Sequence, residues 1–201
     1  MSFGGAEVVG ILAGASFAAG LNVYATVATL GLMARAGVLE LPASLHLIDN
    51  WWTIGAAFAL FALEFVADKI PAFDLIWNAL QTFVRVPIAA LLAYGAAAQL
   101  PPWQQATAAA LGGGIGLAAH GGKIAARAAV TPSPEPFSNM GLSLVEDVVA
   151  ILLTWFAATH PYITAAIVAV LLLLIVLAIR FVLRAMKRLY RGAVRLVEQR
   201  A

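Results

Sequence analysis

The amino-acid sequence predicts an all-α polytopic membrane protein, and its composition and its charge distribution are the observations that predict this fold class. Hydrophobic residues make up 63% of the 201 residues, only 11% are charged, and the mean hydropathy is +0.93. Soluble domains carry about 25% charged residues, so this chain has too few charges to coat a globule in water. A soluble enzyme, a disordered protein and a nucleic-acid-binding module are therefore excluded. The absence of cysteine excludes a disulfide scaffold.

About six stretches are candidates for transmembrane helices, since a span needs about 20 mostly apolar residues. No basic residue precedes the first stretch, so it lacks the positive n-region of a cleaved signal peptide, and we expect it to be retained. Trp51 opens the second stretch, and two prolines with Trp103 separate the third from the fourth. The expected spans are residues 6–34, 51–69, 79–99, 104–128, 141–159 and 162–183.

Two of these spans combine polar residues with glycine, and we expect both to be interrupted. Gly20 and Asn22 stand in the first span, and Gly121 and Gly122 follow His120 in the fourth. Discontinuous transporter helices combine glycine with polar groups in this way. Small residues also recur along both spans, which allows close helix packing and permits a homodimer.

Aromatic residues at the ends of the spans predict the topology. Trp51, Trp103 and Tyr162 each stand at such an end, and Trp and Tyr concentrate at the level of the lipid headgroups. These three points are expected at one membrane face, so that hairpins 51–99 and 104–159 both turn at the opposite face. If the first span crosses once, both termini lie on the side of those turns.

The C-terminal end of the chain is strongly basic. Seven of the 12 lysines and arginines fall between Arg180 and Arg200, and the positive-inside rule places them in the cytoplasm. We expect a transmembrane domain over residues 1–183 and a basic amphipathic helix over residues 184–201. This tail either lies on anionic lipid headgroups or is an ordinary positive-inside anchor. The residues expected on its basic face are Arg184, Arg188, Arg191 and Arg195.

The two hairpins resemble each other, which indicates an internal repeat. Asn78 and Arg85 lie opposite Asn139 and Glu146 at a constant offset of 61 residues, while the matching lysines, Lys69 and Lys123, are offset by 54. Two hairpins that enter from one face imply a pseudo-twofold axis along the membrane normal.

Charged residues inside the expected spans form the candidate site, because such residues are rare, costly and usually functional. Helical spacing places Glu64 and Asp68 on one face, and His120, Lys123 and Arg127 on another. The topology brings all of them to the cytoplasmic half of the bundle. The full set is Glu64, Asp68, Lys69, Asp74, Arg85, His120, Lys123, Arg127, Ser143, Glu146 and Asp147.

This cluster has several interpretations. In the first interpretation, the cluster lines a wet cavity in which the basic groups bind an anion and Glu64, His120 or Glu146 carries a coupling proton. Alternatively it is a sealed network of ion pairs, for instance Arg85 with Glu146, although buried pairs contribute little net stability. A divalent-metal site of His120 with the carboxylates is a third interpretation, disfavoured by the nearby bases. We expect no enzymatic activity, since the chain has neither HExxH nor GxSxG.

Four strings of this sequence resemble an uncharacterised family of prokaryotic integral membrane proteins, catalogued as domain of unknown function 4126. They are GLNVYATVATLGLMARAG, EFVADKIPAFD with the following Arg85, HGGKIAARAAV and SLVEDVVAILL. The resemblance covers roughly residues 10–160 and leaves the last span and the tail outside. It implies a shared fold and a bacterial cytoplasmic membrane, but it brings no established activity and no cofactor.

The expected function is transport of an anionic substrate, an ion or a lipid phosphate, coupled to protons. A looser analogy to DedA-type lipid carriers, at the level of the fold alone, suggests the lipid phosphate. The alternative is a structural or assembly subunit whose ion pairs are sealed. A selective pore is less favoured, because acids and bases are mixed rather than arranged as a ring of one sign. The expected partners are anionic membrane lipids at the tail, and no nucleic acid.

Overall fold

The computed structural model describes residues 5–67, 71–130 and 136–198, and every regular element in these ranges is helical. The predicted all-helical class is therefore confirmed. The elements are α1 (Gly5–Gly10), a π-helical turn (Ile11–Ala15), α2 (Ser16–Leu21), α3 (Val23–Arg35), a 3-10 turn (Ala43–Leu45), α4 (Trp51–Ala67), α5 (Pro71–Ala96), α6 (Pro102–Val130), α7 (Pro136–Thr159) and α8 (Pro161–Glu198).

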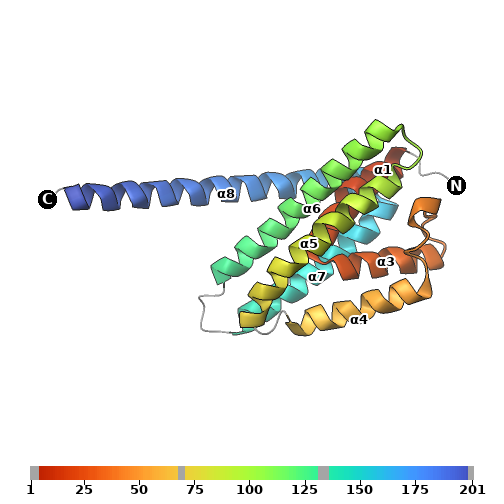
Figure 1. The fold of residues 1–201 in the computed structure, drawn as a ribbon, viewed down its shortest axis with the longest axis horizontal. Coiled ribbons are helices and arrows are strands. Elements are labelled where there is room, and N and C mark those ends of the chain that lie inside the picture. The colour runs from red at the N-terminus through yellow and green to blue at the C-terminus, as the bar shows by residue number, and fades with distance from the viewer. Residues whose placement is uncertain (1–4, 68–70, 131–135, 199–201) are drawn as a thin grey trace.

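Helices α4 to α7 run alternately between two ends of the molecule, and α8 starts at one of these ends and extends away from the bundle (Figure 1). One end, here called the aromatic end, holds the start of α4 at Trp51, the α5–α6 junction beside Trp103 and the α7–α8 junction beside Tyr162. The opposite end, here called the turn end, holds the last residues of α4 and α6 and the first residues of α5 and α7. Segments 51–99 and 104–159 therefore both reverse at the turn end.

The first segment does not cross the bundle. It enters from the aromatic end, where an added Cβ on Gly10 would lie 2.7 Å from the Cβ of Pro161. The chain reverses at Asn22 and returns as α3 to the same end, where the Arg35 guanidinium lies 5.3 Å from the ring centroid of Trp51. The stretch predicted as one span, residues 6–34, is therefore a re-entrant hairpin whose tip lies inside the protein.

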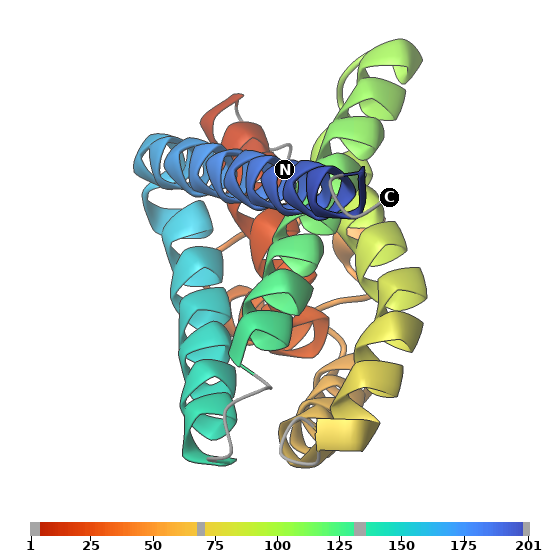
Figure 2. The same cartoon turned by 90° about the vertical axis from the view of Figure 1, so that its left-hand side faces the viewer.

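The inward arm of this hairpin lies between the longer helices, as Figure 2 shows. Small residues allow this close approach: an added Cβ on Gly20 would lie 2.3 Å from the backbone oxygen of Gly116 in α6. Ser16 also donates a hydrogen bond of 3.2 Å to the carbonyl of Ala89 in α5. The close packing that the small residues predicted is therefore present between α2 and α6.

Helix α8 is continuous from Pro161 to Glu198, so the expected boundary at residue 184 is not a helix boundary. It extends away from the bundle far beyond the other helices (Figure 1), and most of the apolar side chains between Pro161 and Arg184 are exposed. An apolar helix surface of this kind suits contact with lipid tails rather than water.

Three helical segments among the described residues are long and apolar enough to cross a membrane. They are Ile76–Ala96, Met140–Thr159 and Pro161–Arg184, and the apolar segments Gly5–Leu21, Val23–Arg35 and Trp51–Ala67 are shorter. Helix α6 has sufficient length, but its glycines, its histidine and its two basic side chains reduce its hydropathy. The chain is therefore a helical membrane protein by length and composition, with fewer long apolar helices than the six predicted.

Substitutions at two nearby glycines of α6 test its close packing against α5. An added Cβ on Gly112 would lie 2.4 Å from the Cβ of Ala93, whereas one on Gly114 would meet no heavy atom within 4 Å. Gly112→Ala should destabilise the protein by about 1–3 kcal/mol through overpacking. Gly114→Ala should stabilise it by up to about 1 kcal/mol, since alanine favours a helix. Thermal unfolding in one detergent compares them, and equal midpoints for the two variants would contradict the close approach of α5 and α6.

Candidate functional site: a charge network at a helix break

The site begins at Asn22, which interrupts the first helix. Its backbone is extended, with φ −148° and ψ 103°, and its side-chain oxygen caps α3 by accepting a hydrogen bond of 2.9 Å from the Ala25 N–H. Asparagine is among the best N-capping residues, so the sequence favours a new helix starting here. The side-chain amide of Asn22 also donates to Asp147 of α7 at 2.8 Å. The interruption predicted at Gly20 and Asn22 is thus present.

The end of α2 leaves backbone carbonyls that two buried cations satisfy. Arg85 of α5 donates through Nη1 to the Gly20 carbonyl at 3.3 Å, and Lys123 of α6 donates to the Leu21 carbonyl at 3.1 Å. The last carbonyls of a helix have no intrahelical partner and carry partial negative charge, so cations are favourable there. The break therefore favours basic side chains at positions 85 and 123, where they donate hydrogen bonds to these carbonyls.

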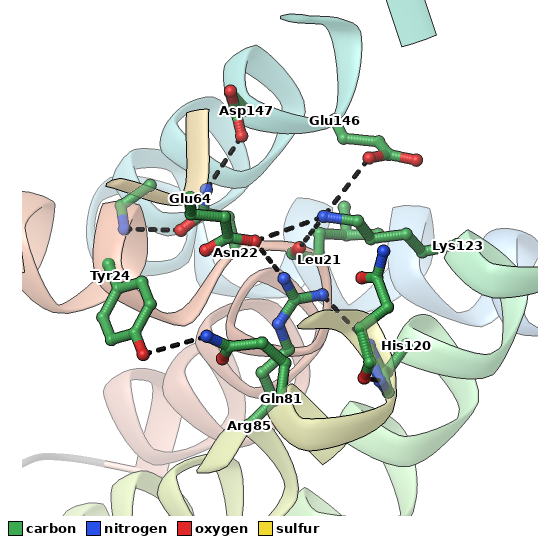
Figure 3. A network of polar contacts seen from close by, with 12 residues as sticks. Leu21, Asn22, Tyr24, Glu64, Gln81, Arg85, His120, Lys123, Glu146 and Asp147 are labelled. Carbon is green, nitrogen blue, oxygen red and sulfur yellow. Dashed lines mark hydrogen bonds and ion pairs between the residues drawn. The ribbon is translucent and has the colours of Figure 1, made fainter. Parts of the chain in front are cut away.

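Glu64, in the last turn of α4, bridges these two cations. Its Oε1 accepts from Arg85 Nη2 and lies 3.3 Å from Lys123 Nζ (Figure 3). The side chains of all three residues are fully buried. Their helices are thus joined through one carboxylate oxygen directly beside the helix break.

A second carboxylate extends the network to α7. Glu146 Oε2 lies 3.4 Å from Lys123 Nζ and accepts from Arg127 Nη2 at 2.7 Å. Lys123 therefore lies between two carboxylates and a backbone carbonyl. Arg85 pairs with Glu64, so the expected pair of Arg85 with Glu146 is wrong: α4 brings its own carboxylate to Arg85, while Glu146 faces the bases of α6.

His120 is held in a defined protonation state by its neighbours. Its Nδ1 lies 3.0 Å from Arg85 Nη1, and its Nε2 lies 2.8 Å from Thr82 Oγ1 and 3.0 Å from the Asn78 carbonyl. A guanidinium can only donate, so Nδ1 accepts, and the ring proton is on Nε2 facing the carbonyl. His120 is therefore a neutral ring that orients Arg85.

The network is buried and balanced in charge. Exposure of its charged side chains runs from 0% for Glu64 and Arg85 to 6% for Glu146. Burying an unbalanced charge is strongly unfavourable, so the pairing is a condition for this packing. Among the described side chains of the network, the three carboxylates, Glu64, Glu146 and Asp147, equal in number the three cations, Arg85, Lys123 and Arg127.

The second predicted helix interruption is not present in the structure. The expected interruption at Gly121 and Gly122 is wrong, because α6 is continuous there. The polar side chains on either side, His120 and Lys123, meet partners from other helices, so no backbone group has to be freed for them. Gly122 instead gives room to Ile175 of α8, which an added Cβ would approach to 3.0 Å.

The remaining predicted residues lie at the edge of the site or outside the described residues. Ser143 is buried, with 1% of its surface exposed, one turn before Glu146 on α7. Asp68 and Lys69 lie outside the described residues, and Asp74 is in the first turn of α5 with its side chain outside the described part. Arg184 is exposed on α8; the side chains of Arg188, Arg191 and Arg195, further along that helix, lie outside the described part.

No group of three or more histidine and carboxylate side chains in the described part of the chain is placed to hold a metal ion. The carboxylates of the network meet cationic side chains instead. This arrangement disfavours the metal-site interpretation.

Sequence reasoning missed a polar contact next to the network. Gln81 of α5 donates to the Tyr24 hydroxyl of α3 at 3.0 Å, and Gln81 is 3% exposed. The signal was present in the spacing, because Asn78, Gln81 and Arg85 follow i, i+3 and i+7 on one helical face. Tyr24 had no such signal, since only the reversal at Asn22 brings it to α5.

Fold and site together define a helical membrane protein with a charge network buried at the tip of a re-entrant helical hairpin. The chain belongs to the family described as domain of unknown function (DUF4126), whose model matches residues 9–181. The match extends beyond residue 160, so the apolar part of α8 belongs to the family domain, contrary to the expected limit. No curated protein and no solved structure matches the chain.

The contact between Asn22 and Asp147 can be tested by exchanging the two side chains. Asn22→Asp keeps an acceptor for the Ala25 N–H but places a second carboxylate beside Asp147, so it should cost about 2–4 kcal/mol of stability. Adding Asp147→Asn restores one amide and one carboxylate, and should recover about 1–3 kcal/mol as coupling between the sites. Unfolding of the four proteins of this cycle measures the coupling, and strict additivity would contradict the contact.

Proposed function

We propose that this protein is a small membrane transporter that moves an anionic substrate, an inorganic ion or a lipid phosphate, in exchange for or together with protons. The observation that carries the proposal is the helix break at Asn22, which lies inside the bundle and is surrounded by charged side chains. Irregular backbone at membrane depth is tolerated where it is buried in protein or lines a cavity. Secondary transporters bind substrates at such breaks.

The chemistry of the network suits an anion and a proton. Arg85 and Lys123 supply positive charge at the break, and Glu64 and Glu146 are carboxylates that can take up a proton when a cation leaves them. His120 accepts from Arg85, so a proton on Nδ1 would face a guanidinium. We therefore assign the coupling proton to a carboxylate and give His120 a positioning role.

The proposal includes the finer topology. Helices α4 to α8 would cross the bilayer, segments 51–99 and 104–159 would be repeat-related hairpins, and the basic end of α8 would lie on the cytoplasmic side of a bacterial inner membrane. Support comes from the alternating course of α4 to α7 and from the positive-inside rule. The exposed Arg184 begins the part of α8 that would meet anionic headgroups.

Flux measurements on proteoliposomes test this function. Glu64→Gln removes the carboxylate that balances Arg85 and Lys123, so it should abolish flux driven by a pH step while the protein stays folded. Electrophysiology on a solid-supported membrane detects charged cargo, and a fluorescent phosphatidic acid assay detects electroneutral lipid movement. Glu40→Gln, an exposed carboxylate in the loop after α3, is the control and should keep full flux. Undiminished flux in Glu64→Gln, or none in the wild type by either assay, would reject the proposal.

A second candidate function is a structural or assembly subunit, favoured by the complete burial of Glu64, Arg85 and Lys123. The chain has no cysteine, so Ser143→Cys, at a site 1% exposed, distinguishes the two functions. A transporter must open, so a polar thiol reagent should modify this cysteine at a rate that depends on pH. No modification under any condition, with Ser44→Cys reacting at the exposed surface, would favour the sealed subunit.

Membrane-impermeant maleimide tests the re-entrant course of the first segment. Because the hairpin returns to its starting side, Gly5→Cys and Glu40→Cys should both react in intact spheroplasts, whereas Arg184→Cys should react only after permeabilisation. Such labelling would place the N-terminus outside, unlike the cytoplasmic N-terminus expected for a first segment that crosses once. Protection of Gly5→Cys until permeabilisation would show that the segment crosses.

A further inference from the structure

We propose that Arg85 and Lys123 form a binding site for an oxyanion, and that Glu64 fills this site with its own carboxylate in the present structure. An incoming phosphate or carboxylate would compete with Glu64 for the same two cations, and Glu64 would take up a proton as it leaves. This inference rests on the proposed transport of an anion and names the groups that would bind it.

The Glu64 carboxylate leaves some of the hydrogen-bonding groups at this site without a partner. Both cations meet one of its oxygens, Oε1, while Oε2 is buried and accepts no hydrogen bond. Nε of Arg85 is also buried without a partner. Arginine binds oxyanions best through a fork of two parallel N–H groups, and here Nη2 is used while Nε is not. A ligand with two or more oxygens can use both groups of this fork.

The two cations are held in place without Glu64. Arg85 Nη1 donates to the Gly20 carbonyl and contacts His120 Nδ1, and Lys123 donates to the Leu21 carbonyl. These contacts come from the end of α2 and from α6 rather than from α4. Departure of the Glu64 side chain therefore leaves a prepared pair of cations, as an anion site requires.

Charge balance links anion entry to protonation. Arg85 and Lys123 already face the Glu64 carboxylate, so an anion that binds them while Glu64 stays ionised would place a second negative charge beside that carboxylate unless a proton enters too. Protonation turns the Glu64 carboxylate into a neutral carboxylic acid, and one negative charge on the ligand replaces it. The other titratable or charged groups that surround Glu64 in the described network are Tyr24, Arg85, His120, Lys123, Arg127, Glu146 and Asp147.

Glu146 is the natural comparison. Like Glu64, it contacts two cations, Lys123 and Arg127, through one oxygen, Oε2, while its Oε1 is buried and accepts no hydrogen bond. The difference lies in the arginine, because Arg127 directs both Nε and Nη2 to this oxygen, at 3.2 and 2.7 Å. Its guanidinium fork is thus fully used, unlike that of Arg85. We therefore expect the exchange at Glu64 and not at Glu146.

Inorganic phosphate and phosphatidic acid are the probes, because a free oxyanion and a lipid headgroup present the same chemistry. The purified protein is reconstituted in nanodiscs of neutral lipid, with phosphate added to the buffer or phosphatidic acid added to the bilayer, and chloride of equal ionic strength as the control. Glu64→Gln should show a saturable rise in unfolding midpoint that does not depend on pH. Wild type and Glu146→Gln should show it only as the pH falls.

Calorimetry in two buffers of different ionisation enthalpy then counts protons. The wild type should take up about one more proton per bound anion than Glu64→Gln does, because only one carboxylate is neutralised. Glu64→Asp, which keeps the charge but withdraws it by one methylene, should bind the probe more tightly than the wild type at the same pH. This variant keeps the test informative if Glu64→Gln fails to fold.

The outcomes separate this inference from the proposed function. A response to phosphate assigns the site to a free oxyanion, and a response to phosphatidic acid alone assigns it to a lipid headgroup. Binding of a probe by Glu64→Gln, together with no flux in the wild type, would keep the site and reject transport. Equal proton uptake in wild type and Glu64→Gln, or no response of any variant to either probe, would overturn the oxyanion site even if flux is observed.

Discussion

The structure depends on one constraint: a chain that reverses inside an apolar bundle must find partners for the backbone groups that its helix leaves free. At Asn22 the helix ends, and the carbonyls of Gly20 and Leu21 face the interior. Two cations satisfy them, and those cations require carboxylates in turn. The charge network is thus a consequence of the reversal, because the free carbonyls need the cations as hydrogen-bond donors and the buried cations need the carboxylates as counter-charges.

The same chain of requirements explains which helices meet. Glu64 comes from α4, Arg85 from α5, Lys123 from α6 and Asp147 from α7, so four helices converge on the tip of the re-entrant hairpin. Apolar packing alone is weakly directional and would allow these helices to slide. The small residues around Gly20 and Gly112 permit the close approach, and the ionic contacts define its register. Removal of one charged side chain of the network therefore affects the packing between several helices.

Much of this architecture could be predicted from the sequence, but the pairing of the charged side chains could not. Composition predicted helices, charged residues within apolar stretches predicted a polar cluster, and glycine beside Asn22 predicted the break. The same reasoning failed at Gly121 and Gly122, because a glycine that makes room for a neighbouring helix looks identical to one that breaks its own. Pairing of Arg85 with Glu64 rather than Glu146 depends on how α4 packs, which no local pattern contains. The reversal of the first segment was likewise hidden, since both of its arms are apolar.

Whether the network is a sealed structural element or a working binding site depends on how strongly its cations hold the carboxylates that pair with them. Each of the two glutamates leaves one carboxylate oxygen without a hydrogen bond, but Glu146 meets two groups of the Arg127 guanidinium, whereas Glu64 leaves the Nε of Arg85 unpaired. Buried polar atoms without partners are costly, and a protein that needed only a structural ion pair would gain by closing this fork. A carboxylate that meets only one N–H of the Nε–Nη2 pair of Arg85 is the member of the network that can leave most readily.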